Sequence, residues 1–308
     1  MFRLKGIIMI ISGSMLWGAT GPILEWILET TNWSVPFLLT IRLIVPGLFI
    51  LTILFSMKKD IFSVWKTAFW RNQLFIFGVF GMLGVQYSFI ATIDASNAVV
   101  ATLLQFSAPI FITLYVSLTH KKFPPQYQIV GIAGILVGLF LLLTNGSIDS
   151  LMVGQKALLW GLALGVTFAF YTLYPANLMR EWNILIVVGW AMLIGGVVLG
   201  VINRVWSSNA WSILLLPNVA LMLSLLLFFG TIAFTLFLNS MKYISAVETS
   251  ILSSVEPLTA MAISIVWFGT MLKSIQLIGA ILMLIFVTQL SIGGNKKTVK
   301  LKNMEKGA

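Results

Sequence analysis

The sequence predicts an all-α integral membrane protein with ten transmembrane helices, arranged as two inverted five-helix repeats. Three observations lead to this fold class. Of the 308 residues, 59% are hydrophobic and only 9% are charged, whereas soluble proteins carry about 25% charged residues. Apolar runs long enough to cross a membrane recur along the whole chain without a long polar interval. The first half of the chain also matches the second half at one constant offset.

The apolar runs define the predicted helices. A helix needs roughly 20 apolar residues to cross the hydrocarbon core of a bilayer. The first run follows Arg3 and Lys5 as a signal peptide would, but its length and the spans after it favour a first transmembrane helix. The ten predicted spans lie near residues 6–28, 35–57, 72–92, 97–119, 126–144, 155–176, 183–203, 217–240, 245–268 and 273–292.

The basic residues predict the orientation. With a cytoplasmic N-terminus, 15 of the 19 Lys and Arg residues fall in cytoplasmic segments. Only Lys156, Arg204 and Lys273 then lie outside, and Arg42 lies within the second span. This bias predicts a multi-pass protein of the cytoplasmic (plasma) membrane with both termini in the cytoplasm. The net charge of +10 therefore reflects the membrane topology. We expect the lipid bilayer as a partner, and we expect no nucleic acid.

The composition also argues against metal and redox chemistry. The chain has no cysteine, and its single histidine, His120, lies in a polar loop beside lysines. Disulfides, thiolate nucleophiles and cysteine-based metal sites are excluded. We expect no metal, no cofactor and no catalytic residues. The C-terminal residues 296–308 are expected to form a disordered basic cytoplasmic tail near anionic lipid.

An offset of 148 residues superimposes the first five spans on the last five. Pro109 then falls on Pro257, and Gly131 falls on Gly279. A common register for five helices and their loops indicates an internal repeat, with residues 1–148 as the first copy and 149–295 as the second. Each copy holds an odd number of spans, so the second copy must be inverted in the membrane.

Three segments carry a family resemblance: SGSMLWGATGPIL at 12–24, LLQFSAPIFITL at 103–114 and SAVETSILSSVEPLTAMAISIVWFGT at 245–270. On these segments the chain resembles the EamA family of the drug/metabolite transporter (DMT) superfamily. The resemblance implies a central cavity lined mainly by helices 1, 3, 4, 6, 8 and 9, and export of amino acids, amines, related metabolites or drugs. The chain departs from the family where an acidic residue often ends helices 4 and 9, because Lys122 and Thr270 stand near those positions.

Glu256 is the strongest candidate for a functional residue. It lies about eleven residues into the ninth span, and an ionisable group at that depth costs about 2.5–3.5 kcal/mol on insertion scales. It directly precedes Pro257, which, like Pro109 in the fourth span, predicts a local helix break. Thr249, Ser253, Ala260 and Ser264 share its helical face and form one stripe with it.

Other polar and aromatic side chains inside the spans complete the predicted substrate-binding or coupling set. The residues chosen besides Glu256, Thr249 and Ser253 are Trp17, Gln105, Tyr87 and Tyr171. Packing of small residues and hydrogen bonds between helices explain such stripes about as well. The glycine pairs Gly134/Gly138, Gly161/Gly165 and Gly196/Gly200 are expected to let helices pack closely.

Glu25 and Arg42 lie at similar depth in the first two spans and form a predicted ion pair. One interpretation is a structural pair, and the other is a gate that breaks when the outer side opens. The overall prediction is a secondary transporter that exports a small metabolite, such as an amino acid, amine, carboxylate or drug-like solute, by alternating access. An intramembrane lipid-modifying enzyme and a passive channel are the alternatives, and a homodimer stays open.

Overall fold

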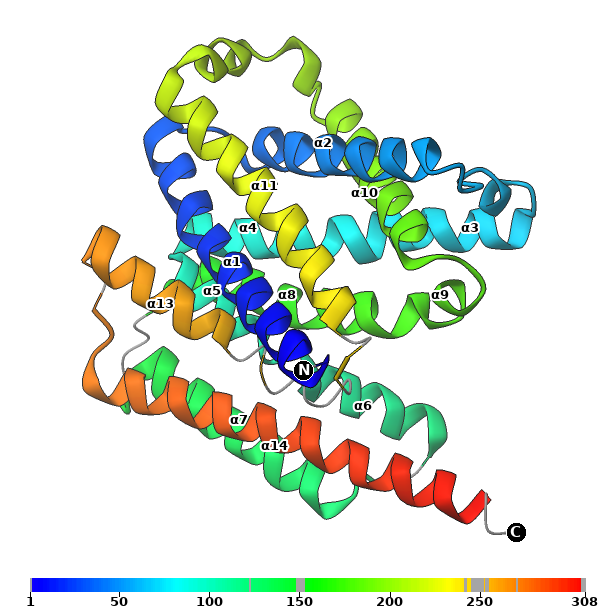
Figure 1. The fold of residues 1–308 in the computed structure, drawn as a ribbon. Helices are drawn as coiled ribbons and strands as arrows, with labels where there is room; N and C mark the ends of the chain where they lie inside the picture. Colours follow the sequence, from blue (N-terminus) through cyan, green and yellow to red (C-terminus); the bar gives the residue numbers. More distant parts are fainter. Residues whose placement is uncertain are drawn as a thin grey trace. The chain divides into compact units, whose positions relative to one another are not determined.

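The computed structural model describes residues 2–121, 123–147, 153–240, 243–244, 252, 255–269 and 271–305. Throughout these ranges the regular structure is helical, with no β-strand (Figure 1). The chain forms two compact units. Unit 1 contains residues 1–22, 98–155 and 229–308, and unit 2 contains residues 23–97 and 156–228.

Seven helices in the described ranges are long and apolar enough to cross a membrane: Arg3–Thr31, Val35–Ser56, Ala68–Ala95, Ala98–Thr119, Gln126–Thr144, Gln155–Ala176 and Ile184–Ile202. A further pair, Asn209–Leu215 and Pro217–Ala233, bends by 92° at its break, and Val255–Phe268 and Ser274–Gln289 are shorter apolar helices. The all-helical membrane class is therefore confirmed. The count of ten spans stays a prediction, since most of residues 245–254 lie outside the described ranges.

Unit 1 is built from parts of α1 and α11 together with five complete helices. Its elements are α1 (Phe2–Thr31, to Pro22), α5 (Ala98–Gln105), α6 (Ala108–His120), α7 (Gln126–Thr144), α11 (Pro217–Ser240, from Phe229), α13 (Val255–Phe268) and α14 (Ser274–Glu305). Apolar residues of α5, α7 and α14 form one buried core: Val99, Leu103, Ile135, Leu142, Ala280, Met283 and Val287.

Helices α7 and α14 pack backbone to backbone (Figure 1). A Cβ added at Gly138 would lie 2.7 Å from the Gly279 carbonyl oxygen, and one added at Gly134 would lie 2.1 Å from the Phe286 ring. Later residues of α7 meet earlier residues of α14, because Gln276 Nε2 donates a 2.9 Å hydrogen bond to the Leu142 carbonyl. The pair is therefore antiparallel, and the packing predicted for Gly134 and Gly138 is confirmed.

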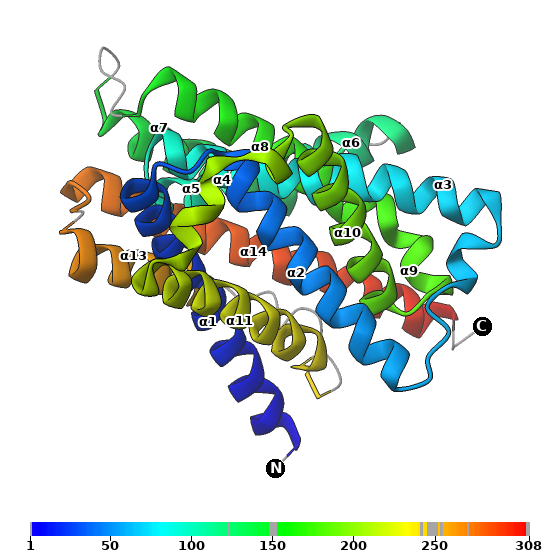
Figure 2. The ribbon, with the colours of Figure 1, turned by 90° about the horizontal axis from the view of Figure 1, so that it is seen from above.

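Unit 2 is arranged around a second antiparallel pair, α2 and α10 (Figure 2). A Cβ at Gly47 would lie 3.0 Å from the Gly189 carbonyl, and a Cβ at Gly200 would lie 3.0 Å from Thr40. The contacts run in opposite order along the two helices. The elements of unit 2 are the end of α1, α2 (Val35–Ser56), η1 (Ser63–Trp65), α3 (Ala68–Ile76), η2 (Phe77–Leu83), α4 (Gly84–Ala95), α8 (Gln155–Leu173), η3 (Tyr174–Ala176), α9 (Leu178–Glu181), α10 (Ile184–Ile202), η4 (Val205–Ser207), η5 (Asn209–Leu215) and the start of α11.

The third span is not a regular α-helix. Its middle, η2, is a seven-residue π-helix that widens the helix between α3 and α4. Gly78 in this segment packs against α10, where its Cβ would lie 2.9 Å from Ile194. Extended π-helical segments are rare and occur often at functional sites.

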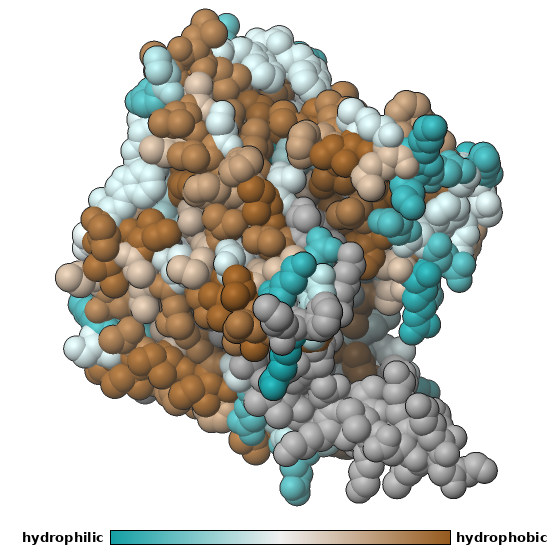
Figure 3. Space-filling model, viewed as in Figure 1, coloured by the Kyte–Doolittle hydropathy of each residue, from teal (hydrophilic) through white to brown (hydrophobic). Residues whose placement is uncertain are grey.

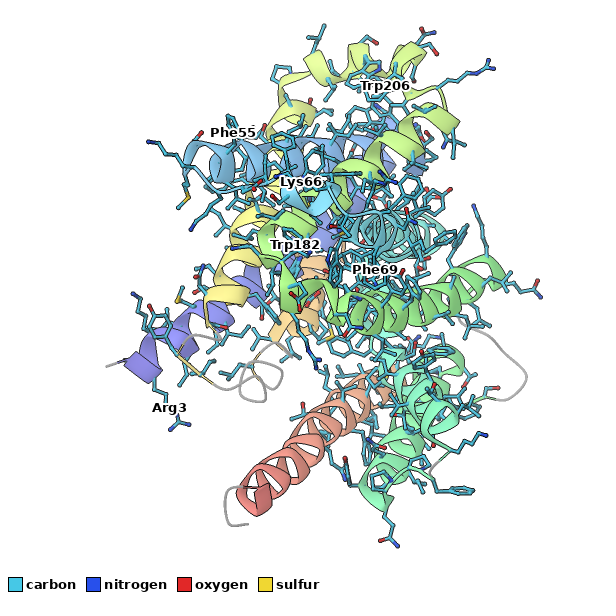
Figure 4. All side chains as sticks on the ribbon, turned by 90° about the vertical axis from the view of Figure 1, so that its right-hand side faces the viewer. Arg3, Phe55, Lys66, Phe69, Trp182 and Trp206 are labelled. Atoms are coloured by element: carbon cyan, nitrogen blue, oxygen red, sulfur yellow. The ribbon has the colours of Figure 1, made fainter. Side chains whose placement is uncertain are left out.

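The loop between α2 and η1 is held by two sets of contacts. Asp60 accepts hydrogen bonds from the backbone N–H groups of Phe62 (3.1 Å) and Ser63 (3.0 Å), and from the Ser63 hydroxyl. These bonds hold the pKa of the Asp60 carboxyl below its ordinary value, the Ser63 side chain having the largest effect. Trp190 of α10 donates a 2.8 Å hydrogen bond to the Ile61 carbonyl. Figure 4 labels three residues at this end of unit 2. Phe69 lies in α3, Lys66 directly follows η1, and Trp182 directly follows α9.

Large apolar side chains lie exposed on the helices, as brown areas in Figure 3 illustrate for one face. Phe80 is 62% exposed and Val266 is 88% exposed. Apolar surface on this scale is expected where a protein faces lipid.

One expectation was wrong at the C-terminus. Residues 296–305 are helical, because α14 continues from Ser274 to Glu305. No proline interrupts this stretch, and Lys, Leu, Met and Glu are all favourable helix formers. Only residues 306–308 of the predicted tail lie outside the described ranges.

Candidate functional site

The predicted site residues fall into separate groups. Trp17, Gln105 and Glu256 lie in unit 1 with both predicted helix-break prolines, Pro109 and Pro257. Four further residues lie in unit 2: Tyr87, Tyr171, Glu25 and Arg42. Thr249 and Ser253 lie outside the described residues.

Glycine brings α1 and α13 into close contact in unit 1. A Cβ added at Gly18 would lie 2.4 Å from the Glu256 carbonyl oxygen, 2.9 Å from Thr259 Cβ and 3.2 Å from the Ala260 nitrogen. Side chains at positions i, i+3 and i+4 share one face of a helix. Glu256, Thr259 and Ala260 therefore lie on the face of α13 that packs against α1. The contact in α1 is at Gly18, the residue that follows Trp17. Gly18 was not among the predicted site residues, although its small size within the SGSMLWGATGPIL motif is a usable signal.

The Glu256 carboxylate is half-buried. Among the described residues it has no hydrogen-bond or ion-pair partner. A charged group buried in a membrane protein is expected to pair with another group or to mark a functional path. Ala260 and Ser264, on the same predicted stripe, are fully buried, so that part of the stripe is packed inside the protein.

Pro109 lies in the first turn of α6, directly after an interruption of the helix. Helix α5 ends at Gln105, and the two residues between the helices, Phe106 and Ser107, make short-range hydrogen bonds to Leu103 and Leu104. Proline has no N–H, so the Gln105 carbonyl receives no hydrogen bond from residue 109. The half-buried Gln105 side chain is thus at the end of a helix, beside a carbonyl that lacks its usual helical donor.

Two serines near these residues were not predicted. The hydroxyl groups of Ser14 in α1 and Ser107 in the break are buried and have no hydrogen-bond partner in the described structure. Ser14 is 0% exposed and Ser107 is 4% exposed. Most serines and threonines in the other helices, such as Thr102, instead donate to a carbonyl one turn earlier.

In unit 2, the two predicted tyrosines pack against aromatic rings. Tyr171 of α8 stacks on Phe77 at 5.5 Å with an interplanar angle of 27°. Tyr87 of α4 lies 5.4 Å from Trp160 of α8. The third and sixth spans therefore lie side by side, and these contacts run in opposite order along them.

The predicted Glu25–Arg42 ion pair is not formed. Arg42 Nη1 is buried without a hydrogen-bond partner, and the described structure contains no ion pair of Arg42. Glu25 is 5% exposed and makes other contacts. Similar depth does not bring two groups together, because each residue also turns a helix by about 100°. The described residues also contain no group of three or more His, Cys, Asp or Glu side chains that could hold a metal ion.

Apolar helices of membrane-spanning length, with isolated polar residues buried among them, define a multi-pass helical membrane protein. The model of the EamA-like transporter family matches residues 4–144 and again residues 155–292. The chain belongs to this family of membrane transporters, within the drug/metabolite transporter superfamily.

Relatives agree with this assignment. The chain is 33% identical over 294 residues to the uncharacterised inner membrane transporter YicL of Salmonella typhimurium, covering 95% of this chain and 97% of that protein. It is 25% identical over 240 residues to the uncharacterised transporter YyaM of Bacillus subtilis, with 76% of each chain covered. A solved crystal structure covers 96% of this chain and 99% of its own at a TM-score of 0.61 and 14% identity, which shows a shared fold.

Proposed function

We propose that the protein is a secondary transporter that works by alternating access between two inverted repeats, residues 1–148 and 149–295. Helices that match across the 148-residue offset support this proposal. α7 begins at Gln126 and α14 at Ser274, 148 residues later, while α2 and α10 begin 149 residues apart. Both matched pairs pack antiparallel, as expected when one repeat is inverted relative to the other.

The transport site is proposed to lie in unit 1, at Trp17, Gln105 and Glu256. The observation that carries this choice is half-buried Glu256, whose backbone packs against Gly18 of α1 and whose carboxylate has no partner among the described residues. The direction is export of a small metabolite from the cytoplasm, and both termini are cytoplasmic in the plasma membrane. The charge bias of the loops supports this orientation.

Counterflow in proteoliposomes tests the proposal. Labelled amino acids, amines and carboxylates would be screened with and without a pH gradient, for the native protein and Glu256→Gln. Glu29→Gln is the matched control, because Glu29 is an exposed acid near the outer end of α1.

Saturable counterflow in native protein and Glu29→Gln, lost in Glu256→Gln, is the expected result. Flux without saturation or counterflow would indicate a channel, and product formation without transport would indicate an enzyme. Unchanged pH dependence in Glu256→Gln would remove proton coupling through this residue.

A further inference from the structure

Two prolines leave backbone carbonyl oxygens of unit 1 without their helical donors. Pro22 lies within α1, so the Gly18 carbonyl receives no hydrogen bond from residue 22. Pro109 has the same effect on the Gln105 carbonyl at the end of α5. Such carbonyls are tolerated within a membrane only where protein or a polar cavity surrounds them.

These carbonyls lie at one level of unit 1. A Cβ at Gly21 would lie 3.2 Å from Ala98 Cβ and 4.0 Å from Thr102 Oγ1, so α1 and α5 are neighbours. Gln105 lies three residues after Thr102, and Gly18 lies three residues before Gly21, each step being about 4.5 Å along a helix. In the proposed topology the first and fourth spans run in opposite directions. A step back along α1 to Gly18 and a step forward along α5 to Gln105 therefore move the same way across the membrane and end at a similar depth.

Glu256 lies at this level as well, since its carbonyl oxygen would be 2.4 Å from a Cβ at Gly18. Two buried hydroxyls without partners, on Ser14 and Ser107, belong to the same two segments of chain. In a folded protein nearly all buried polar atoms have a partner. Two unpartnered hydroxyls and two carbonyls without their helical donors, all on adjacent segments, therefore indicate that a ligand supplies the missing partners.

The chemistry of these groups selects the ligand. One carboxylate and two carbonyls accept hydrogen bonds and carry negative charge or partial charge. In the described spans of unit 1 the basic side chains are Arg3 and Lys5, which lie at least 13 residues before Gly18 in the sequence, or roughly 20 Å along the helix. A primary ammonium group has three donors and a positive charge, which match the three acceptors.

We propose that unit 1 binds the protonated amine of the transported solute through the Glu256 carboxylate and the carbonyl oxygens of Gly18 and Gln105. The inference rests on the proposed function in two respects: the opposite directions of the first and fourth spans, and calling this ligand the transported solute. Ser14 and Ser107 add hydroxyl groups to the site. Trp17, whose ring packs edge-on against Phe237 at 5.5 Å, directly precedes Gly18 in α1, and aromatic rings attract ammonium ions.

Binding to the purified full-length protein tests the site without transport. Three probes share one ring and differ in the head group: phenethylamine, N-acetylphenethylamine and phenylacetate. Isothermal titration calorimetry should detect the amine and neither the neutral amide nor the anion. Glu256→Gln should raise the Kd of the amine by about tenfold or more, while Glu29→Gln should leave it unchanged.

A backbone variant tests the role of the carbonyls. Pro22→Ala restores an N–H donor to the Gly18 carbonyl and should raise the amine Kd several-fold without changing any side chain of the site. Pro46→Ala is the matched control, since Pro46 also lies inside a helix, α2 of unit 2, and should have no effect.

The outcomes separate this inference from transport. Counterflow without preference for the amine probe would overturn the amine site and leave the carrier standing. Amine binding that depends on Glu256 and Pro22, without counterflow, would support the site and overturn the transport role. Equal binding of all three probes, or competition by sodium chloride alone, would overturn the inference, the latter in favour of an inorganic cation.

Discussion

Substituting Gly18 by alanine tests the contact between α1 and α13. The added Cβ would lie 2.4 Å from the Glu256 carbonyl oxygen, whereas real Cβ atoms do not approach below 3.0 Å. The nearest obstacles are the backbone of Glu256 and Ala260 and the Cβ of Thr259, which cannot move away by a rotamer change. The two helices must therefore separate by at least about 0.6 Å in a close-packed interior.

The expected change in the free energy of unfolding follows from two opposing effects. Overpacking costs about 1–3 kcal/mol, and a backbone obstacle favours the upper end. Alanine is preferred over glycine within a helix by about 1 kcal/mol, which offsets part of that cost. We expect Gly18→Ala to lower the free energy of unfolding by about 2 kcal/mol, or roughly 30-fold in the unfolding equilibrium.

Gly230→Ala is the matched control. Gly230 lies within α11, and no heavy atom of the described residues lies within 4 Å of the added Cβ. Here only the helix preference acts, so the variant should be more stable than native protein by about 0.5–1 kcal/mol. Unfolding by SDS in mixed micelles, followed by tryptophan fluorescence, measures both variants. Equal midpoints for native protein and Gly18→Ala would refute the close contact of α1 with α13.

Two further predictions concern contacts outside the site. Gln276→Leu should lower the free energy of unfolding by about 1–3 kcal/mol, because the Leu142 carbonyl loses its buried donor. Gln128→Leu, at the position 148 residues earlier, should change it by less than about 0.5 kcal/mol, and equal losses in the same SDS titration would contradict this reasoning. The pKa of Asp60 is lowered by its bonds to Ser63, so folding favours the carboxylate. Its contribution to loop order is complete above the ordinary carboxyl pKa and is lost as the pH falls through the lowered value. Hydrogen exchange at residues 62–63 should show this acid transition in native protein and not in Asp60→Asn; its persistence in the variant would exclude Asp60 as its cause.

The positions of the helices could be read from the sequence. The second and fifth predicted spans, 35–57 and 126–144, match α2 (Val35–Ser56) and α7 (Gln126–Thr144) within one residue. In lipid every backbone polar group needs an internal partner, so an apolar run of sufficient length has to become a helix. The chemistry of proline likewise placed the break of the fourth span next to Pro109.

The side-chain contacts between neighbouring helices could not be predicted from the sequence in the same way. Depth suggested a Glu25–Arg42 pair, but Arg42 has no ion pair in the described structure. Tyr171 was predicted to belong to the substrate-binding or coupling set, and the structure places its ring on Phe77 of a π-helical segment. A hydropathy pattern sets the height of a side chain in the membrane, whereas its neighbours depend on how each helix is rotated and which helix lies beside it.

Composition and hydropathy were enough to predict the class of this protein, the bounds of most of its spans and the polar residues inside them, because burial in lipid constrains composition so strongly. The contact of α1 with α13 at Gly18 and Glu256 became visible only in the folded chain, since backbone contact between helices depends on the absence of a single Cβ. The same is true of the antiparallel packing of matched helices, α7 with α14 and α2 with α10. Those pairings arise from side-chain shape along two surfaces at once, which no single stretch of sequence contains.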